Sequence, residues 1–497
     1  MKGPAPPALL GIDTRALAVF RMGLGVAVAV DLALRARALA AHYSDAGVLP
    51  RAALEADPLG RLLPYLSLHL QGGSPAWQVA LFAATALCAA ALALGLRTRA
   101  AAVATWLLVL SLQNRNPLLH YGGDNVLALL LFWSLFLPLG ARFSLDARAG
   151  RAPVVAGGVA RSVGSAGLLV QVAALHFFSA LHKRAPEWIP DGTALEYALH
   201  VDKFVRPLGV VLRELPVLPS LLTYGSYALE LVGPFLLFAP FAQPALRTLT
   251  SGAFLAFHAG IALTMDLVLF SWISMLSMLV FLPAGLWDRL EAGLARRRGA
   301  PSPEPATGRA RAPRATWVPS PAAQVCAAAA LAFVLAWNAF TLRSDWREAL
   351  EARPWLGWMA APALWLRLGQ TWAMFAPHPP KETRWHAVTG LLEDGRRVDL
   401  LFERDAPPRL AKPVRRGEYY PDGRWERLFA NLPGFEYADA TRSLGAYFCR
   451  RGAQRHGARL REVRILVRRD ETLPGGVHAL RQPRLLARFA CRGGLID

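Results

Sequence analysis

Long apolar runs alternate with short polar segments over roughly the first 340 residues of the chain. A helix needs about 20 apolar residues to cross the hydrocarbon core of a bilayer. We therefore expect an all-α polytopic membrane bundle of about nine transmembrane helices, surrounded by membrane lipid. The nine candidate segments lie near residues 14–34, 75–95, 99–119, 123–140, 160–182, 221–241, 246–265, 267–287 and 320–342.

The pattern shortens after residue 370 and becomes typical of β-structure. Residues 385–392 and 396–402 flank Asp394-Gly395, a pair that favours a tight hairpin turn. Residues 462–468 predict a further strand. The region 370–497 is therefore expected to be a small soluble β or α+β domain.

Charge in the connecting segments predicts the orientation. Residues 1–290 hold the first eight spans, and residues 291–319 form a linker rich in Pro, Gly and Arg. Because basic loops are retained in the cytoplasm, this linker and the N-terminus are expected inside. Residues 320–369 then supply the ninth span and a Trp-rich interfacial helix near 350–369. The C-terminal domain would be extracytoplasmic.

Composition agrees with a membrane protein, with 54% hydrophobic and 18% charged residues. The net charge of +20 could indicate a nucleic-acid-binding protein, but no nucleic-acid-binding motif is visible. Part of the charge comes from arginines that flank the spans, so no nucleic-acid partner is expected. The Ala- and Arg-rich bias suggests a GC-rich bacterial genome and hence a bacterial inner membrane, with the C-terminal domain periplasmic. Cys449 and Cys491 lie in the polar region and could pair if that region faces an oxidising compartment.

Several ionisable residues interrupt the apolar segments. Intramembrane ionisable groups usually face a cavity or pair with one another. Lys183 ends the fifth segment, where it could be a base or could extend to the interface. Arg21 could pair with Asp31 or Glu230, and these residues together with His258 could instead line the path of a carrier.

Metal chemistry is not expected. His182 and Lys183 lie 18 and 17 positions before His200, but no carboxylate or cysteine has the spacing of a metal site. No glycine-rich phosphate loop or nucleophile elbow is present in the sequence either.

A series of motifs resembles the HTTM (horizontally transferred transmembrane) domain family, which is related to vitamin K-dependent gamma-carboxylase. The resemblance covers roughly residues 10–290, with a further similar motif after the ninth span. The motifs are Phe20-Arg21, Asp31-Leu32, Tyr43–Pro50, Arg115–Pro117, Gly122–Asp124, Arg142–Asp146, Phe177–Lys183, Trp188, Asp191-Gly192, Phe257-His258, Phe270–Trp272 and Gln370–Pro377.

The resemblance implies an oxygen-dependent lyase chemistry on a reduced, vitamin K-like quinone. Lys183 would deprotonate the quinone, and reaction with O2 would produce an epoxide and a base able to remove a carbon-bound proton, after which CO2 could be captured. His258 is the second implied catalytic residue. The residues implied to line or support the quinone site are Arg21, His120, Asp124, His182 and Trp188.

One departure affects the carboxylation step. The carboxylase has a histidine entering its fourth span where this chain has Gly123 or Asp124, and His120 is three or four residues away. The resemblance therefore implies proton abstraction and epoxidation more directly than carboxylation. A peptide or small-molecule substrate would be met on the extracytoplasmic side. The alternatives are a non-catalytic membrane receptor or assembly protein and a small-molecule carrier.

Overall fold

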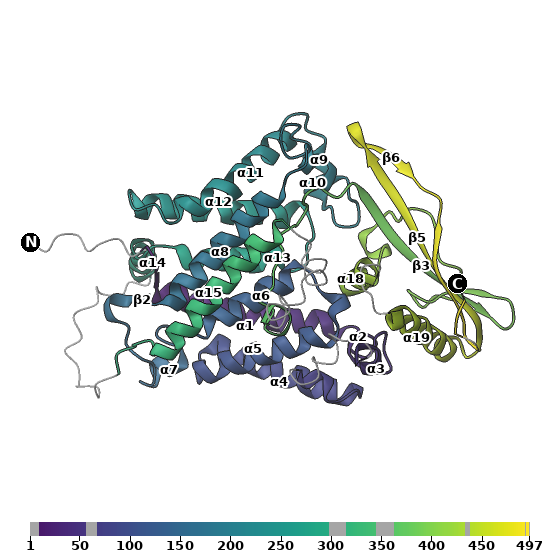
Figure 1. Cartoon of the computed structure of the whole chain (residues 1–497), viewed down its shortest axis with the longest axis horizontal. Coiled ribbons are helices and arrows are strands. Elements are labelled where there is room, and N and C mark those ends of the chain that lie inside the picture. Colours follow the sequence, from purple (N-terminus) through teal and green to yellow (C-terminus); the bar gives the residue numbers. More distant parts are fainter. Residues whose placement is uncertain are drawn as a thin grey trace, which may run out of the picture.

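The computed structural model describes residues 9–55, 67–297, 315–343, 362–432, 438–492 and 494–496. A bundle of helices forms one end of the molecule and a curved β-sheet forms the other (Figure 1). Most of the predicted interfacial helix near 350–369, and most of the linker, fall outside these ranges.

Each of the nine predicted segments contains a helix. These helices are α1 (Thr14–Ala36), α4 (Pro75–Leu94), α5 (Thr98–Arg115), α6 (Gly122–Ser134), α8 (Val163–His182), α11 (Leu218–Leu236), α12 (Gln243–Thr264), α13 (Phe270–Met278) and α15 (Pro321–Thr341). The other helices of this part of the chain are α2 (Leu39–Tyr43), α3 (Arg51–Glu55), α7 (Leu145–Arg148), α9 (Ala194–Leu199), α10 (Pro207–Arg213) and α14 (Ala284–Arg297).

Fewer of these helices qualify as membrane spans than the sequence predicts. Five helices of the described chain, α1, α4, α8, α12 and α15, are long and apolar enough to cross a bilayer. A sixth span results if residues 270–281 and 284–297, which meet at 98°, are taken together. Helix α6 has 13 residues and nearly all of them are buried in the protein, so its length need not match the bilayer.

Local sequence explains where the helices begin and end. Helix α4 begins after Ser74, whose hydroxyl accepts the Trp77 amide at 3.2 Å, with Pro75 in the first turn. It ends at Gly95, which has φ 69°. An added Cβ there would lie 1.5 Å from the Arg21 guanidinium, so both the conformation and the contact require glycine.

The C-terminal region forms a six-stranded antiparallel half-barrel. Its main strand order is β4 (Arg397–Asp399), β3 (Glu382–Leu392), β5 (Leu460–Leu473), β7 (Arg484–Ala490) and β8 (Gly494–Ile496), while β6 (Val477–Leu480) pairs with β5. The predicted hairpin is confirmed, with Gly395 at φ 88° in its turn, and the predicted strand at 462–468 lies within β5. Helices α18 (Gly423–Asn431) and α19 (Ala438–His456) lie between the sheet and the bundle (Figure 1).

The segment that leads into this domain passes through the bundle. Gln370 exchanges two side-chain hydrogen bonds with Gln171 of α8, at 2.7 and 3.2 Å. The Trp372 indole donates to Gln370 at 2.6 Å and is almost fully buried. The residues just after position 370, which the sequence pattern places in a soluble domain, are therefore in contact with membrane helices.

Candidate functional site

A cavity of about 610 Å³ lies among α8, α11 and α12, at the end of the bundle nearest the half-barrel. Its walls are mostly aliphatic and aromatic, and include Leu175, Leu229 and Ile261. Met374 and Phe375, from the segment that enters the bundle, contribute to its lining. Lys183 and His258 both line this cavity, so the structure brings together the two residues predicted to be catalytic.

Lys183 lies at the C-terminal end of α8, where the helix stops shortly before Pro186. Its ammonium forms an ion pair with Glu230 of α11, and the Ser179 hydroxyl donates to the same carboxylate at 3.2 Å. Ser179 and Lys183 are one helical turn apart, which places both side chains on one face of α8. The Lys183 side chain is only 5% exposed, so it does not extend to the membrane interface.

The Trp188 ring covers the other side of the Lys183 ammonium, with 4.4 Å between the nitrogen and the ring centroid. Trp188 also lines the cavity, and its indole donates to the Phe375 carbonyl at 3.2 Å. A cation between a carboxylate and an aromatic face is held in one position. Trp188, a predicted site residue, therefore lines the cavity next to Lys183.

Two buried histidines, His176 and His258, also line the cavity. The rings of His176 and His258 are 5.3 Å apart, and Phe254 lies 4.3 Å from His176. Neither ring nitrogen of His258 has a hydrogen-bond partner within the described part of the chain, and the same holds for Nδ1 of His176. Buried polar atoms are nearly always paired in folded proteins. These nitrogens are therefore suited to a polar group of a ligand or to ordered water.

The other predicted site residues do not line this cavity. Arg21 donates to the Phe143 carbonyl at 2.6 Å, beside Gly95. His182 directly precedes Lys183 at the end of α8, is half-buried and is not among the residues that line the cavity. Successive residues of a helix point in different directions, so the neighbour of Lys183 does not share its face.

His120 and Asp124 belong to a separate polar cluster. The Nε2 atom of His120 lies 2.7 Å from the Gln113 carbonyl, and its Nδ1 lies 3.9 Å from Asp124. Burial lowers the pKa of His120 to about 3, so this imidazole is neutral at physiological pH. Neither residue reaches the cavity, which leaves the position of the carboxylase histidine without a counterpart at this site.

The predicted pairing of Arg21 with Asp31 or Glu230 is wrong. Asp31 pairs with Arg35 at 2.6 Å and with Arg424 of α18 at 2.5 Å. Both arginines also pair with Asp124, at 2.6 and 2.7 Å. The i, i+4 spacing of Asp31 and Arg35 was available in the sequence as a signal. Glu230 and His258 line the large cavity, whereas Arg21 and Asp31 do not, so only two of the four residues named for a carrier path share one cavity.

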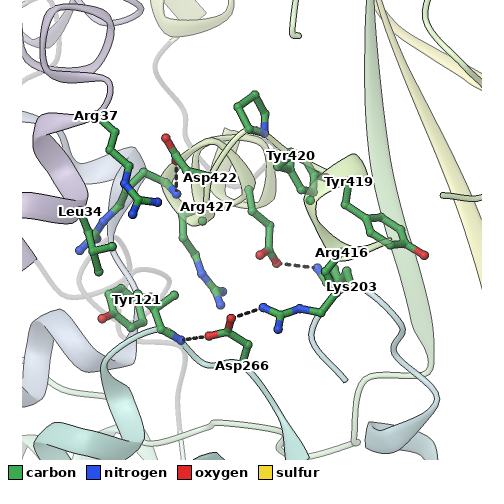
Figure 2. A pocket seen from close by; sticks show the side chains of 16 residues that line it. Leu34, Arg37, Tyr121, Lys203, Asp266, Arg416, Tyr419, Tyr420, Asp422 and Arg427 are labelled. Atoms are coloured by element: carbon green, nitrogen blue, oxygen red, sulfur yellow. Dashed lines mark hydrogen bonds and ion pairs between the residues drawn. The ribbon is translucent and has the colours of Figure 1, made fainter. Parts of the chain in front are cut away.

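A smaller cavity of about 330 Å³ lies between the bundle and the half-barrel (Figure 2). It shares Tyr121 and Arg427 with the larger cavity. Arg416 forms an ion pair with Asp266 at its edge. Burial alone would raise the pKa of Asp266, but Arg416, the Val268 amide and Arg206 together outweigh burial and hold that pKa below its ordinary value. We call this polar space the vestibule.

Comparison with known proteins gives one match. The family model described as HTTM domain matches residues 11–286, which is more than half of the chain. No curated protein and no solved structure matches the chain.

Proposed function

Because the chain belongs to the HTTM-domain family, whose domain is found in vitamin K-dependent gamma-carboxylase, we propose that it is a membrane enzyme acting on a reduced quinone. The observation that carries this proposal is that Lys183 and His258 face one apolar cavity. Lys183 would be the base. The proposed activity is quinone- and O2-dependent proton abstraction and epoxidation.

The cavity fits a lipid-borne aromatic ring. Its volume of about 610 Å³ lies within the range of roughly 300–1,000 Å³ that is typical of small-molecule sites. Its walls are apolar, and the unpaired nitrogens of His176 and His258 could bind ring oxygens. A quinone head group has this combination of an apolar ring and two oxygens.

A route from the bilayer supports the same ligand class. Gly225 of α11 and Gly260 of α12 line the cavity, and an added Cβ at either position would meet nothing within 4 Å. Leu222, on the same face of α11, is 42% exposed. Small residues on two lipid-facing helices therefore leave space through which a membrane-dissolved molecule could enter.

A bound reduced quinone would supply the chemistry of the site, since its reaction with O2 to the quinone epoxide and water is a four-electron oxidation that provides the driving force. The Lys183 ammonium would first pass a proton from Nζ to Oε2 of Glu230, with which it is in contact. The free amine would then accept a proton from a ring hydroxyl at Nζ. The Ser179 hydroxyl would hold the carboxylate in place.

The surrounding residues would exclude water and fix the ring. Trp188 covers the amine, and Met374 and Phe375 close the cavity on the half-barrel side. Excluding water strengthens each electrostatic interaction in the site and protects a strong base from solvent protons. Arg21, His120, Asp124 and His182 would support the fold around this site and not contact the ring.

Carboxylation remains a possible second outcome. A peptide or small-molecule substrate would approach through the vestibule, which joins the catalytic cavity at Tyr121 and Arg427. CO2 would be captured there if carboxylation occurs. His120 and Asp124 do not line the cavity, which favours epoxidation with proton abstraction alone.

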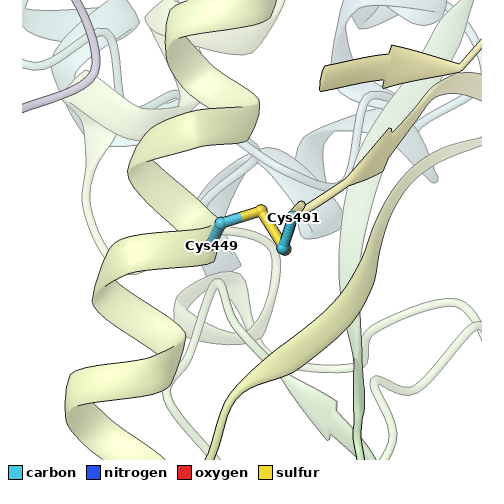
Figure 3. Close-up of a disulfide and its surroundings, with 2 residues drawn as sticks. All are labelled: Cys449 and Cys491. Carbon is cyan, nitrogen blue, oxygen red and sulfur yellow. A yellow bond between two sulfur atoms is a disulfide. The ribbon is translucent and has the colours of Figure 1, made fainter. Parts of the chain in front are cut away.

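We also propose that the half-barrel faces an oxidising compartment, the periplasm of a bacterium, with the N-terminus in the cytoplasm. Cys449 of α19 and Cys491 after β7, which the sequence left as a conditional pair, form a disulfide with a Cα–Cα distance of 5.6 Å (Figure 3). Disulfides persist outside the reducing cytosol. The bundle would lie in the inner membrane.

Purified full-length protein in detergent, supplied with a reduced menaquinone and O2, tests the proposal. Quinone epoxide measured by chromatography should form with the wild type and be lost in Lys183→Met. Arg184→Met changes the neighbouring exposed cation and should leave turnover unchanged. Epoxide formation by Lys183→Met at the wild-type rate would overturn the assignment of the base.

Two further measurements cover the other outcomes. Incorporation of labelled CO2 into protein or peptide would show whether carboxylation accompanies epoxidation. A wild type that binds the reduced quinone, detected by quenching of Trp fluorescence, but forms no epoxide would instead be a binding protein. That result would favour the receptor alternative over the enzyme.

A further inference from the structure

A third cavity, of about 690 Å³, lies at the end of the bundle away from the half-barrel. It is enclosed by the start of α5, the segment that follows α6 and the residues that lead into α15. Backbone hydrogen bonds between Val154 and the stretch 315–317 hold the last of these segments in place. The quinone site proposed above does not extend to this cavity, and no residue is shared between the two.

The charged groups around this cavity are mainly cationic. Arg97, Arg99 and Arg151 line it together with one acidic residue, Asp146, so three positive charges face one negative charge and the sum is +2. The Asp146 carboxylate already accepts the amides of Arg97 and Thr98, at 3.1 and 2.7 Å, and the Thr98 hydroxyl at 2.7 Å.

The arginines are available for a further anion. Arg151 approaches Asp146 only at 3.4 Å. Within the residues that the structure covers, the guanidinium groups of Arg97 and Arg99 have no ion-pair partner. All three side chains belong to exposed residues. A ligand with an anionic group could therefore reach Arg97 and Arg99 without breaking a described ion pair, and could share Arg151 with Asp146.

The remaining walls are apolar. Phe136, Leu137, Trp317 and Val318 line the cavity, and Val318 is 77% exposed. An exposed aliphatic residue beside a tryptophan at the end of membrane helices is suited to contact with lipid. A small hydrophilic anion would leave these walls without a partner, whereas a lipid would cover them with an acyl chain.

We propose that this cavity binds an anionic phospholipid, with its phosphate among Arg97, Arg99 and Arg151 and an acyl chain along Phe136 and Val318. Basic pockets between membrane helices on the cytoplasmic side are known to bind anionic head groups, and each arginine adds attraction near an anionic surface. The bound lipid would fix the ends of α5 and α15 against each other.

Native mass spectrometry of the detergent-purified full chain tests this site. The probes are phosphatidylglycerol and phosphatidylcholine with identical acyl chains. The wild type should retain phosphatidylglycerol at least tenfold more strongly. Replacing Arg97, Arg99 and Arg151 by glutamine should remove this preference. The matched control replaces Arg289, Arg296 and Arg297, which are exposed on α14 and do not line the cavity, and should keep it.

A second variant tests the apolar part of the site. Ala323→Trp adds a large side chain at the wall of the cavity without removing a charge, and should also abolish retention of phosphatidylglycerol. Excess inorganic phosphate should not displace the lipid. Equal retention of the two lipids by the wild type, or unchanged preference in the triple glutamine variant, would overturn the proposal. None of these readouts depends on quinone turnover.

Discussion

Removing one member of the Lys183–Glu230 pair should destabilise the protein far more than removing both. The two side chains are 5% and 6% exposed, so neither charge can be solvated by bulk water if its partner is lost. Lys183→Met would leave the carboxylate with only the Ser179 hydroxyl as a described partner. Breaking a buried pair in this way costs about 3–5 kcal/mol, whereas replacing both members by neutral groups is often close to neutral.

A double-mutant cycle on Lys183 and Glu230 should therefore show strongly non-additive changes in the free energy of unfolding. Lys183→Met should reduce the free energy of unfolding by about 3–5 kcal/mol, and Glu230→Gln should also destabilise. The combined variant should be more stable than the sum of the two changes by at least about 3 kcal/mol. Unfolding in mixed detergent micelles, followed by Trp fluorescence, provides the measurement. Losses below about 1 kcal/mol that simply add would refute the description of this pair as buried and coupled.

The same variants separate stability from catalysis. The combined variant keeps the cavity filled and the charges balanced, so it should fold and still bind the reduced quinone. Because it has no amine at position 183, it should form no epoxide. Turnover by a folded combined variant would show that the pair is structural and that the base lies elsewhere.

Three further predictions concern other parts of the molecule. Burial lowers the pKa of His386 to about 3, whereas the pKa of this residue in the unfolded chain is about 6.5. The half-barrel should therefore have its full stability above about pH 6.5 and lose up to about 1.4 kcal/mol per pH unit as the pH falls toward 3. His386→Gln should flatten this pH dependence in thermal melts, and parallel curves for the variant and the wild type would contradict the assignment. Arg424→Gln should leave the two buried aspartates, Asp31 and Asp124, with one arginine and lower the free energy of unfolding by about 3–5 kcal/mol. The half-barrel should then become accessible to limited proteolysis. An unchanged digestion pattern would show that this contact does not hold the domain. Gly260→Leu should obstruct the cavity and raise the KM for the quinone about tenfold. Gly252→Leu, on the same helix but outside the cavity, should leave the KM unchanged. Equal effects of the two substitutions would exclude quinone entry between α11 and α12.

Local patterns in the sequence predicted the elements well. A helix lies in each of the nine apolar segments, because an apolar run can be satisfied in a membrane only by intrahelical hydrogen bonds. The hairpin at Asp394-Gly395 was also predictable from nearby residues. The pairing of Cys449 with Cys491 was only one possibility from the sequence, because the two residues are 42 positions apart. The number of spans was not, because a short helix such as α6 is recognised as internal only once its neighbours are known.

By itself, the sequence determined which segments are helical, where the first hairpin of the β-rich domain lies, and which residue types could carry chemistry. Only the tertiary structure decided which of them meet. Glu230 is 47 positions from Lys183, and Arg424 is 393 positions from Asp31, so neither partner follows from helical spacing. Partners of buried charges are selected by how helices pack, since a charge removed from water is stabilised by the opposite charge that lies nearest in space, whatever its place along the chain.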